Sequence, residues 1–373
     1  MKHVLSFFTG FALIIGQAHA ADRVVGPTSM YSNIGSAIAA STDGDRILVA
    51  QGVYNEYINI SSSLSLQPLV KGTRYHVLHG VNIVGANGKS INLSGMRTTV
   101  VRTTGTYYQR CDLSITDARL DRCEAPVPQV HVELYRDTVA EMLLMSSGSV
   151  YGCTFGIAGS PSYCGIQVFP GSVLPDDCEI IGNSFGAPQA ECIMGIRTDR
   201  PFHLENNFVR MSAASAIEVK RSQPPAGVAS TITNNTFYLQ YALGQHQILL
   251  VDSGFTDMIV ARNNVTVNWQ YLFGPIPPNT VLDAAYNLYA APSWINAATG
   301  QPTVGSPLID AGDPDPRYLD LDLTVNDAGC YGGSNSRANF IVPMGAAVVG
   351  FMRAPRVMAQ NQPVNITVFG FDR

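Results

Sequence analysis

Seven charged side chains in the middle of the chain are the groups best placed to do chemistry. They follow apolar runs in three neighbouring stretches: Arg197, Asp199 and Arg200; Glu218, Lys220 and Arg221; and Asp252. Basic side chains of this kind bind anions or move protons, whereas carboxylate oxygens hold hard cations such as calcium. Either chemistry requires a fold that brings these residues together.

A stack of repeats in register would bring them together. Aligning the apolar residues Ile196, Ile217 and Ile248 predicts three sets of neighbours: Arg197 with Glu218, Asp199 with Lys220, and Arg200 with Arg221 and then Asp252. Alternate residues of a strand point to opposite faces, so Arg197 and Glu218 would leave the core on the sheet face. The alternative is a solvated ladder of opposite charges, worth about a few tenths of a kcal/mol per pair.

A phrase that recurs between residues 151 and 265 predicts the stack itself. A polar residue precedes Phe or Val at intervals of 23 to 30 residues in Gly152-Cys153-Thr154-Phe155, Gly182-Asn183-Ser184-Phe185, Glu205-Asn206-Asn207-Phe208, Asn234-Asn235-Thr236-Phe237 and Arg262-Asn263-Asn264-Val265. A second phrase follows the first four copies: Gly165-Ile166-Gln167-Val168, Gly195-Ile196-Arg197-Thr198, Ala216-Ile217-Glu218-Val219 and Gln247-Ile248-Leu249-Leu250. The period and the short, turn-bounded segments predict a solenoid with two strands per coil.

Asparagine is the residue that most of these phrases share. Its side-chain amide both donates and accepts hydrogen bonds, and its backbone tolerates the left-handed region. We therefore expect a ladder along the stack, formed by Asn183, Asn206, Asn235 and Asn263. Cys153 takes this position in the first copy, and a buried thiol is expected to end the ladder there. The alternative is a set of unrelated surface turns.

The opening of the chain resembles a known family. Residues 31–56 include Asp43-Gly44-Asp45, an apolar strand and Gly52-Val53-Tyr54, and this run is similar to the first coil of secreted, right-handed parallel β-helix proteins of the pectate-lyase-like superfamily. The resemblance implies an all-β fold, a right-handed parallel β-helix with a short amino-terminal capping helix. The residues also support this helix independently, because Gly44 can stop it and one face carries Ile34, Ala37, Ile38 and Ser41.

A second resemblance lies near the carboxyl end. Ser306-Pro307-Leu308-Ile309-Asp310-Ala311-Gly312, with the loop that continues to Gly333, is similar to the terminal motif of many bacterial β-helix proteins. Two residues depart from that motif: Leu323 stands where the family usually has Gly, and Cys330 stands where it usually has Ala. The carboxylates between Asp310 and Asp327 are a further candidate for calcium, although Asp before Gly or Pro is also ordinary turn chemistry.

The resemblance implies roles for the charged residues. In polysaccharide lyases of this architecture a basic residue removes the proton beside a uronate, and calcium or Arg neutralises the carboxylate. By analogy Lys220 or Arg221 would be the base, Arg197 the neutralising group, Glu218 and Arg200 substrate-binding residues, and Asp199 and Asp252 metal ligands, with calcium a candidate. Two functions stay open: a non-catalytic protein that presents a sheet surface to an extracellular glycan or cell-surface partner, and a lyase-like enzyme acting on acidic polysaccharide.

The first twenty residues have the pattern of a signal peptide. Lys2 gives a basic start, residues 4–15 are apolar, and Ala18-His19-Ala20 fits the cleavage rule. We expect a secreted, cell-surface or periplasmic protein with a β-helix at 21–333 and a β cap or appendage at 334–373. Without Lys2 the formal net charge is 22 − 28 = −6, which argues against a nucleic-acid partner. No later stretch is apolar over the length of a transmembrane segment.

All seven cysteines follow the leader. Export permits disulfides, and six cysteines are near neighbours in sequence: Cys111 with Cys123, Cys153 with Cys164, and Cys178 with Cys192. Spacing does not fix their connectivity, and a zinc site is disfavoured because no Cys-x-x-Cys is present. We expect Cys330 to be a buried thiol.

A less regular region before the repeats holds histidines among aromatic residues. The histidines are His76, His79 and His131, and the aromatic residues are Tyr75, Tyr107, Tyr108 and Tyr135. Aromatic rings of this kind either form a platform on which sugars stack or pack into the core, and packing is the commoner outcome.

The first prediction concerns the leader. Intact-mass analysis of the protein recovered from the medium or periplasm is expected to give an amino terminus at or near Ala21, because the small-x-small rule places cleavage after Ala20. Recovery of a chain that still begins at Met1 would contradict export through this leader.

Overall fold

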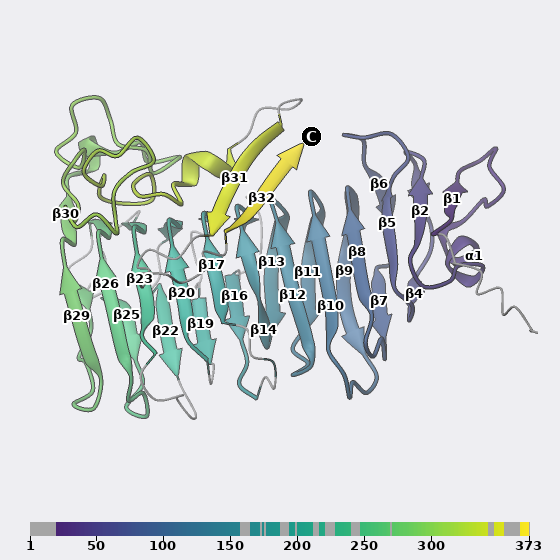
Figure 1. The fold of residues 1–373 in the computed structure, drawn as a ribbon, viewed down its shortest axis with the longest axis horizontal. Coiled ribbons are helices and arrows are strands. Elements are labelled where there is room, and N and C mark those ends of the chain that lie inside the picture. The colour runs from purple at the N-terminus through teal and green to yellow at the C-terminus, as the bar shows by residue number, and fades with distance from the viewer. Residues whose placement is uncertain are drawn as a thin grey trace, which may run out of the picture.

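The chain folds into a parallel β-helix (Figure 1). The structure, a computed structural model, describes residues 20–156, 165–171, 174, 177–186, 194–197, 200–211, 216–220, 228–239, 247–268, 271–341, 347–353 and 366–372. The chain forms two large, all-parallel sheets. A third, separate sheet near the carboxyl end consists of one antiparallel pair of strands. The fold class predicted from the repeats is therefore confirmed. No helix among the described residues has the length and hydropathy of a membrane span.

Sheet A contributes one strand per coil along the whole solenoid. In spatial order its strands are β1 (Asp22–Val25), β2 (Asp45–Val49), β5 (Leu64–Pro68), β8 (Ser90–Ser94), β10 (Cys111–Thr116), β12 (Val130–Tyr135), β14 (Ser147–Tyr151), β17 (Cys178–Ile181), β20 (Phe202–Glu205), β23 (Ser230–Thr233), β26 (Met258–Arg262) and β29 (Val281–Ala285). The phrases between residues 151 and 265 missed these strands. The prediction of two strands per coil is therefore wrong, because each coil between residues 147 and 273 has a third strand in sheet A.

The second sheet has two halves, which we call B1 and B2. Strands of B1 are β3 (Val53–Tyr54), β6 (Tyr75–Val77), β9 (Met96–Thr104), β11 (Arg119–Ala125), β13 (Thr138–Met145), β15 (Thr154–Phe155), β18 (Ser184–Phe185), β21 (Phe208–Met211), β24 (Thr236–Leu239), β27 (Val265–Val267) and β30 (Leu288–Ala290). The long strands β9, β11 and β13 continue into B2, whose other strands are β4 (Ile58–Ile60), β7 (Val81–Val84), β16 (Gly165–Val168), β19 (Met194–Arg197), β22 (Ile217–Lys220), β25 (Gln247–Val251) and β28 (Tyr271–Phe273). The repeated phrases coincide with the later strands of B1 and B2.

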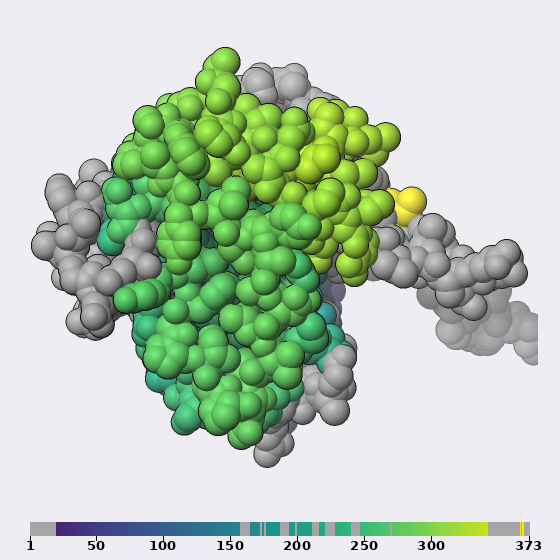
Figure 2. Space-filling view, turned by 90° about the vertical axis from the view of Figure 1, so that its left-hand side faces the viewer, coloured from purple at the N-terminus to yellow at the C-terminus, as the bar shows by residue number. Residues whose placement is uncertain are grey.

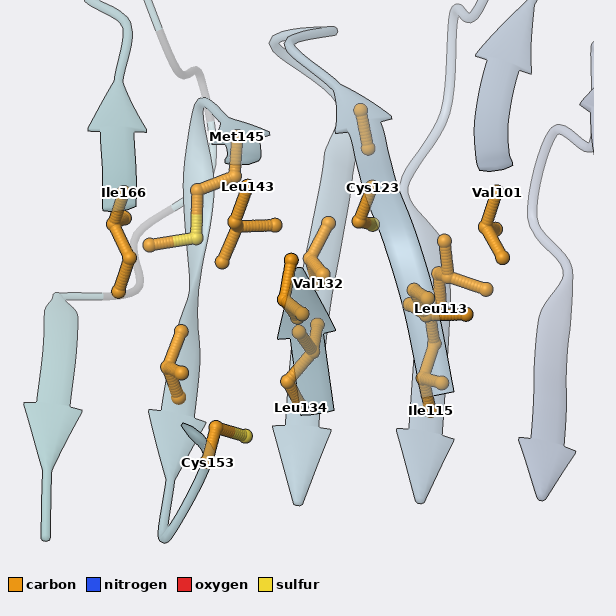
Figure 3. Close-up of a cluster of buried hydrophobic side chains, with 14 of the residues drawn as sticks. Val101, Leu113, Ile115, Cys123, Val132, Leu134, Leu143, Met145, Cys153 and Ile166 are labelled. Carbon is orange, nitrogen blue, oxygen red and sulfur yellow. The ribbon is translucent and has the colours of Figure 1, made fainter. Parts of the chain in front are cut away.

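Inward-pointing side chains fill the space enclosed by the sheets. In β10, Cys111, Leu113 and Ile115 are buried while the residues between them are half-buried. Neighbouring coils pair residue for residue, so Leu113 aligns with Val132 and Ile115 with Leu134. Figure 3 shows these side chains on the inner side of their strands. The apolar core is thus a column that each coil extends by one layer.

A short helix closes the amino-terminal end. α1 (Ile34–Ala39) begins after Asn33, whose side-chain oxygen accepts a hydrogen bond from the Ser36 amide at 2.8 Å. Ile34 and Ala37 are buried against the first coils. The predicted capping helix is confirmed, although it ends at Ala39 rather than at Gly44. It shields the interior of the first coil, which would otherwise be open to water.

From β8 onward a two-residue turn joins sheet A to B1 in each coil. Its first residue has a left-handed backbone with φ between +53° and +70°, and these residues are Gly95, Asp117, Arg136, Gly152, Gly182, Asn206, Asn234, Asn263 and Tyr286. The second residue turns its side chain inward, and from the second of these turns onward the residues at this position are Ala118, Asp137, Cys153, Asn183, Asn207, Asn235, Asn264 and Asn287. We call the second position the ladder position.

The asparagines at the ladder position bond from coil to coil. The backbone amide and Nδ2 of Asn207 both donate to Asn235 Oδ1 at 3.0 Å, and Nδ2 also donates to the Ile180 carbonyl at 2.7 Å. The same pattern links Asn183, Asn235 and Asn264. The predicted ladder is therefore confirmed for Asn183 and Asn235.

The prediction is wrong for Asn206 and Asn263. Each occupies the left-handed first position of its turn, one residue before the ladder. The ladder residues of these coils are Asn207 and Asn264. Two adjacent asparagines offer the same chemistry, so the sequence pattern alone selected the wrong member of each pair.

The ladder also continues beyond Cys153, contrary to expectation. The Cys153 amide donates to Asn183 Oδ1 at 2.8 Å, and Cys153 Sγ accepts a hydrogen bond from the Asp137 amide at 3.3 Å. Asp137 Oδ1 in turn accepts from the Ala118 amide at 2.7 Å. Sulfur and carboxyl therefore replace the carboxamide oxygen in two coils.

The left-handed asparagines hold the segment that follows the last coil. This segment includes the 3-10 turns η1 (Pro292–Trp294) and η2 (Arg337–Phe340) and folds back along the side of the solenoid (Figure 1). Its anchoring bonds run from Asn206 Nδ2 to the Gly332 carbonyl at 2.6 Å, from Asn234 Nδ2 to Asn326 Oδ1 at 2.8 Å, and from the Asp313 amide to Asn263 Oδ1 at 2.7 Å. We call residues 291–340 the return segment.

The return segment ends against glycines in the same turns. The Phe340 ring lies so close to Gly152 and Gly182 that a Cβ at either position would collide with it. Beyond it, β31 (Ala347–Arg353) and β32 (Thr367–Asp372) form an antiparallel pair. Leu323, which departs from the family motif, has a φ of +68°, a backbone conformation that favours Gly.

The described cysteines are free and buried: Cys111, Cys123, Cys153, Cys178 and Cys330. Cys111 and Cys123, which are near neighbours in sequence, form no bridge with each other, because both are free thiols at inward positions of the apolar core. Cys153 and Cys178 are free thiols as well, and their suggested partners Cys164 and Cys192 lie outside the described residues. The expectation that Cys330 is a buried thiol is confirmed.

Asp137 places a carboxyl group where later coils have a carboxamide. It is 1% exposed, and within the described part of the chain its Oδ2 has no hydrogen-bond partner. Burial raises the pKa of the Asp137 carboxyl well above its ordinary value. The folded state therefore retains this proton to higher pH than the unfolded chain does. The contribution of the protonated Asp137 to the free energy of unfolding is complete at pH values below the pKa of the unfolded chain, and it declines as the pH rises above that pKa.

Replacing Asp137 with Asn is expected to stabilise the protein. An amide Nδ2 at this position would face the carbonyl of Ile115, the counterpart of Ile180 in the Asn207 coil, and would donate without needing a proton. Thermal unfolding should show a gain that grows as the pH rises above the ordinary pKa of a carboxyl group, since each pH unit between the unfolded and folded pKa values is worth about 1.4 kcal/mol.

The reverse exchange, Asn207→Asp, is the matched control. It should destabilise the protein increasingly over the same pH range, because it introduces a buried acid with the same linkage. Equal melting temperatures for the parent and Asp137→Asn at pH 8 would contradict the assignment of Asp137 to the ladder.

Candidate functional site

The predicted charged residues lie on B2, but in a different register from the one expected. Ile196 pairs with Val219, and Arg197 therefore lies beside Lys220 rather than beside Glu218. Glu218 pairs with Gly195 and forms an ion pair with Lys220, with Glu218 Oε1 2.7 Å from Lys220 Nζ. The expected Arg197–Glu218 neighbours are thus wrong. The alignment began at Ile196, whereas Met194 is the residue that pairs with Ile217.

The remaining members of the predicted set are dispersed or lie outside the described residues. Asp199 and Arg221 are outside, so the expected pairs Asp199 with Lys220 and Arg200 with Arg221 have no described geometry. Arg200 is half-buried in a bend before β20. Asp252 follows β25 in the row of Lys220, and its Oδ1 accepts a hydrogen bond from the Gly254 amide at 2.9 Å. Its carboxylate closes a turn.

The acidic loop near the carboxyl end is also built from turns. Its carboxylates accept backbone amides: Asp313 from Asp315, Asp322 from Thr324, and Asp327 from Asp310. In the part of the chain that the structure describes, no three or more His, Cys, Asp or Glu side chains are grouped so as to hold a metal ion.

A basic groove lies at the amino-terminal end of B1, and we take it as the candidate functional site. It is open to solvent and has a volume of about 380 Å³. Its walls carry three arginines and a histidine, and the full lining is Gln51, Gly52, Val53, Arg74, Tyr75, His76, Arg97 and Arg119. We call this feature the basic groove.

Strand register places three of these cations in a row. His76 of β6 pairs with Arg97 of β9, and Arg97 pairs with Arg119 of β11. All three side chains leave the outer face of B1, because their neighbours Val77, Thr98 and Leu120 point inward and are buried. Strands of a sheet lie ~4.8 Å apart, so the row presents one cation per strand along the solenoid axis.

The arginines of the groove are available to a ligand. Arg74, Arg97 and Arg119 are exposed, and within the described part of the chain none of them forms an ion pair. By contrast Arg122, farther along β11, is paired with Glu141. Arg74 Nε donates to the Asp117 carbonyl at 3.3 Å, a bond that orients its guanidinium without neutralising it.

The pKa of His76 reflects the positive charge of the groove. Its pKa lies below the ordinary value of 6.5, first because the ring is partly removed from water and second because Arg97 is close. Asp121 acts in the opposite direction. The groove therefore has its full positive charge only at low pH, and the arginines supply its charge at neutral pH.

Sequence reasoning missed these arginines, although a signal was present. Arg97 and Arg119 occupy the position directly after the ladder residue, as Thr154 and Ser184 do in later coils. The early coils have Met96 and Ala118 in place of the ladder asparagine, so they do not match the repeated phrase.

Of the aromatic residues of this region, Tyr75, Tyr107 and Tyr135 pack as the commoner alternative predicts, whereas Tyr108 is 82% exposed. Tyr75 and Tyr107 are 1% and 4% exposed, so they belong to the core rather than to a sugar-stacking platform. His79 Nε2 lies 2.6 Å from Asn55 Oδ1, and His131 Nδ1 lies 3.1 Å from Ser147 Oγ.

Comparison of the chain with protein-family models, with curated proteins and with solved structures gives no match. The function therefore has to be argued from the residues of the groove and from the architecture that aligns them.

The proximity of His76 to Arg97 can be tested by titration. NMR titration of the parent protein should give His76 a pKa below 6.5, and Arg97→Gln should raise it because one repulsive charge is removed. Arg46→Gln, on the distant β2 strand where Arg46 is paired with Asp22, is the control and should leave His76 unchanged. An identical His76 pKa in the parent and Arg97→Gln would contradict the described row.

Proposed function

We propose that the protein is exported and binds a linear anionic glycan of the extracellular space in the basic groove. The observation that carries the proposal is the row of His76, Arg97 and Arg119, joined by Arg74. These cations follow the solenoid axis at the spacing of the strands, so they match a chain with regularly repeated carboxylate or sulfate groups. The leader pattern and the resemblance to secreted pectate-lyase-like proteins support the choice of an extracellular glycan.

The charge of the whole chain favours a glycan over a nucleic acid. The formal net charge without the leader is 22 − 28 = −6, and the groove is a local basic patch on an acidic protein. A general nucleic-acid binder would show an extended basic surface. A short groove with three arginines is better matched to an oligosaccharide with a few charged units.

Binding is a better supported function than catalysis. The lyase alternative needs a free base beside a neutralising cation, and Lys220 Nζ is occupied by Glu218 at 2.7 Å. Arg221, the other candidate base, and Asp199 lie outside the described residues. Among the predicted site residues the structure describes no free base beside a neutralising cation, so we propose a non-catalytic role for the groove.

Binding can be measured by calorimetry with polyuronate and sulfated oligosaccharides. Arg97→Gln and Arg119→Gln should each weaken the preferred ligand about tenfold, since a charged hydrogen bond contributes about 1.5 kcal/mol. Arg46→Gln removes the same charge from a distant strand and should bind like the parent. Affinity should fall with added salt and rise as the pH is lowered through the His76 pKa, because an anion favours the protonated ring.

Three results would overturn the proposal. One is the absence of binding to every acidic glycan at low salt. Another is an equal loss of affinity in Arg97→Gln and Arg46→Gln, which would indicate attraction by net charge alone. The third is tighter binding of single-stranded DNA of equal charge than of any glycan. Release of unsaturated uronate ends, detected by ultraviolet absorbance, would instead restore the lyase alternative.

A further inference from the structure

The last coil of the solenoid exposes a sheet edge. Within the described part of the chain β29 pairs only with β26, and β28 pairs only with β25. Figure 2 looks onto this end, where the green atoms of the last coil face the viewer and the yellow-green return segment lies above them. The amino-terminal end, by contrast, is covered by α1.

The apolar interior is also open at this end. Ile259 and Ala261 of β26 are 0% exposed. Their partners on the last strand, Leu282 and Ala284, are half-buried and exposed respectively. The inward column of side chains therefore meets solvent at the last coil, and further apolar residues around it are exposed: Tyr271 at 47%, Val281 at 58%, Tyr286 at 44% and Tyr289 at 58%.

The free edge of β29 has backbone amides that are not directed at β26. The Val281 amide donates back to the Asp257 carbonyl at 3.2 Å. Amides of a strand alternate between its two sides, so those of Leu282 and Ala284 face the free edge. On β28 the corresponding amide, that of Leu272, donates to the Tyr289 hydroxyl at 3.3 Å. The chain thus covers the edge of β28 in part and leaves that of β29 available.

Charge does not protect this edge. Natural edge strands are usually guarded by lysine or by inward-pointing charges. The only charged residue of β28, β29 and β30 is Asp283, whose two carboxylate oxygens lie 2.6 Å and 2.7 Å from Arg262 Nη2. A partner therefore has to supply an uncharged strand edge with apolar side chains.

We propose that a second copy of this chain covers the last coil, so that two solenoids join tail to tail. The matching surface is the last coil itself, because α1 closes the other end and prevents head-to-tail stacking. A two-fold axis would pair β29 with β29 of the second copy in antiparallel orientation and bring the two open columns of apolar side chains together. Each Asp283 would enter the interface already paired with its own Arg262.

Sedimentation equilibrium over a wide range of protein concentration tests the assembly. The parent should form a dimer and nothing larger, since the twofold contact closes. Val281→Lys should shift the protein to monomer, because Val281 is 58% exposed at the edge and a lysine there would bring a charge into the apolar contact. Val70→Lys is the matched control, since Val70 is 60% exposed near the opposite end, and it should dimerise like the parent.

Hydrogen exchange provides a readout at the strand itself. The amides of Leu282 and Ala284 should become protected as the concentration rises, whereas those of β26 should not change. Ala284→Pro removes one edge-facing donor without breaking the bonds to β26, and it should weaken the dimer while circular dichroism and melting of the monomer stay near those of the parent.

Three outcomes would overturn the proposal. A parent that is monomeric at all concentrations would show that the edge is not used between copies. Open-ended growth into filaments would mean a head-to-tail contact. Dimerisation that survives both Val281→Lys and Ala284→Pro would place the interface elsewhere on the molecule.

Discussion

From β8 onward every coil passes from sheet A to B1 through the same two-residue turn, and the hydrogen bonds of this turn determine how the coils stack. The first residue reverses the chain with a left-handed backbone, and the second must fill a dry corner and satisfy the amide of the coil before it. Asparagine does this best, because Asn235 accepts from Asn207 and also donates to the Leu204 carbonyl. A buried unpaired amide costs about 1 to 3 kcal/mol, so coils without Asn need a substitute. Cys153 and Asp137 are such substitutes.

This fixed turn also places a line of outward-pointing residues along B1, which we call the stripe. The stripe is exposed in the early coils and covered by the return segment in the later ones. The residue after the ladder position always leaves the outer face. In early coils it is Arg97 or Arg119, which meets solvent; in later coils it is Phe208 or Thr236, each 1% exposed under the return segment. The stripe that holds the basic groove is therefore the stripe on which the chain folds back. The return segment ends before the groove because its contacts stop at Phe340, over Gly152 and Gly182.

The sequence could predict features that depend on the spacing of the repeats. It could not predict which of two neighbouring residues takes a given position, or the register of paired strands. Phe155 and Phe185 share a pattern and stack with ring centroids 4.9 Å apart, and α1 could be predicted from the apolar face that holds Ile34 and Ala37. Asn206 was confused with Asn207 because adjacent asparagines have the same propensities and only backbone geometry separates them. The register of Arg197 was wrong by two residues, an error that keeps every side chain on its correct face and so leaves no trace in the apolar pattern. The basic groove escaped notice because the coils that carry it lack the asparagine that marks the others.

The two ends of the solenoid obey the same requirement by different means. Coils of a β-helix gain stability from their neighbours, so a terminal coil lacks half of its contacts. At the amino-terminal end α1 supplies them with Ile34 and Ala37. At the other end the chain continues for many residues, yet the return segment follows the side of the coils, where Asn206, Asn234 and Asn263 hold it. Those bonds to the left-handed turns hold the return segment along the flank of the solenoid. The segment therefore does not cover the end of the last coil, where Leu282 is half-buried and Ala284 is exposed. Because no other described segment covers this end, we propose that an identical end closes it, and its apolar, nearly uncharged character suits such a contact.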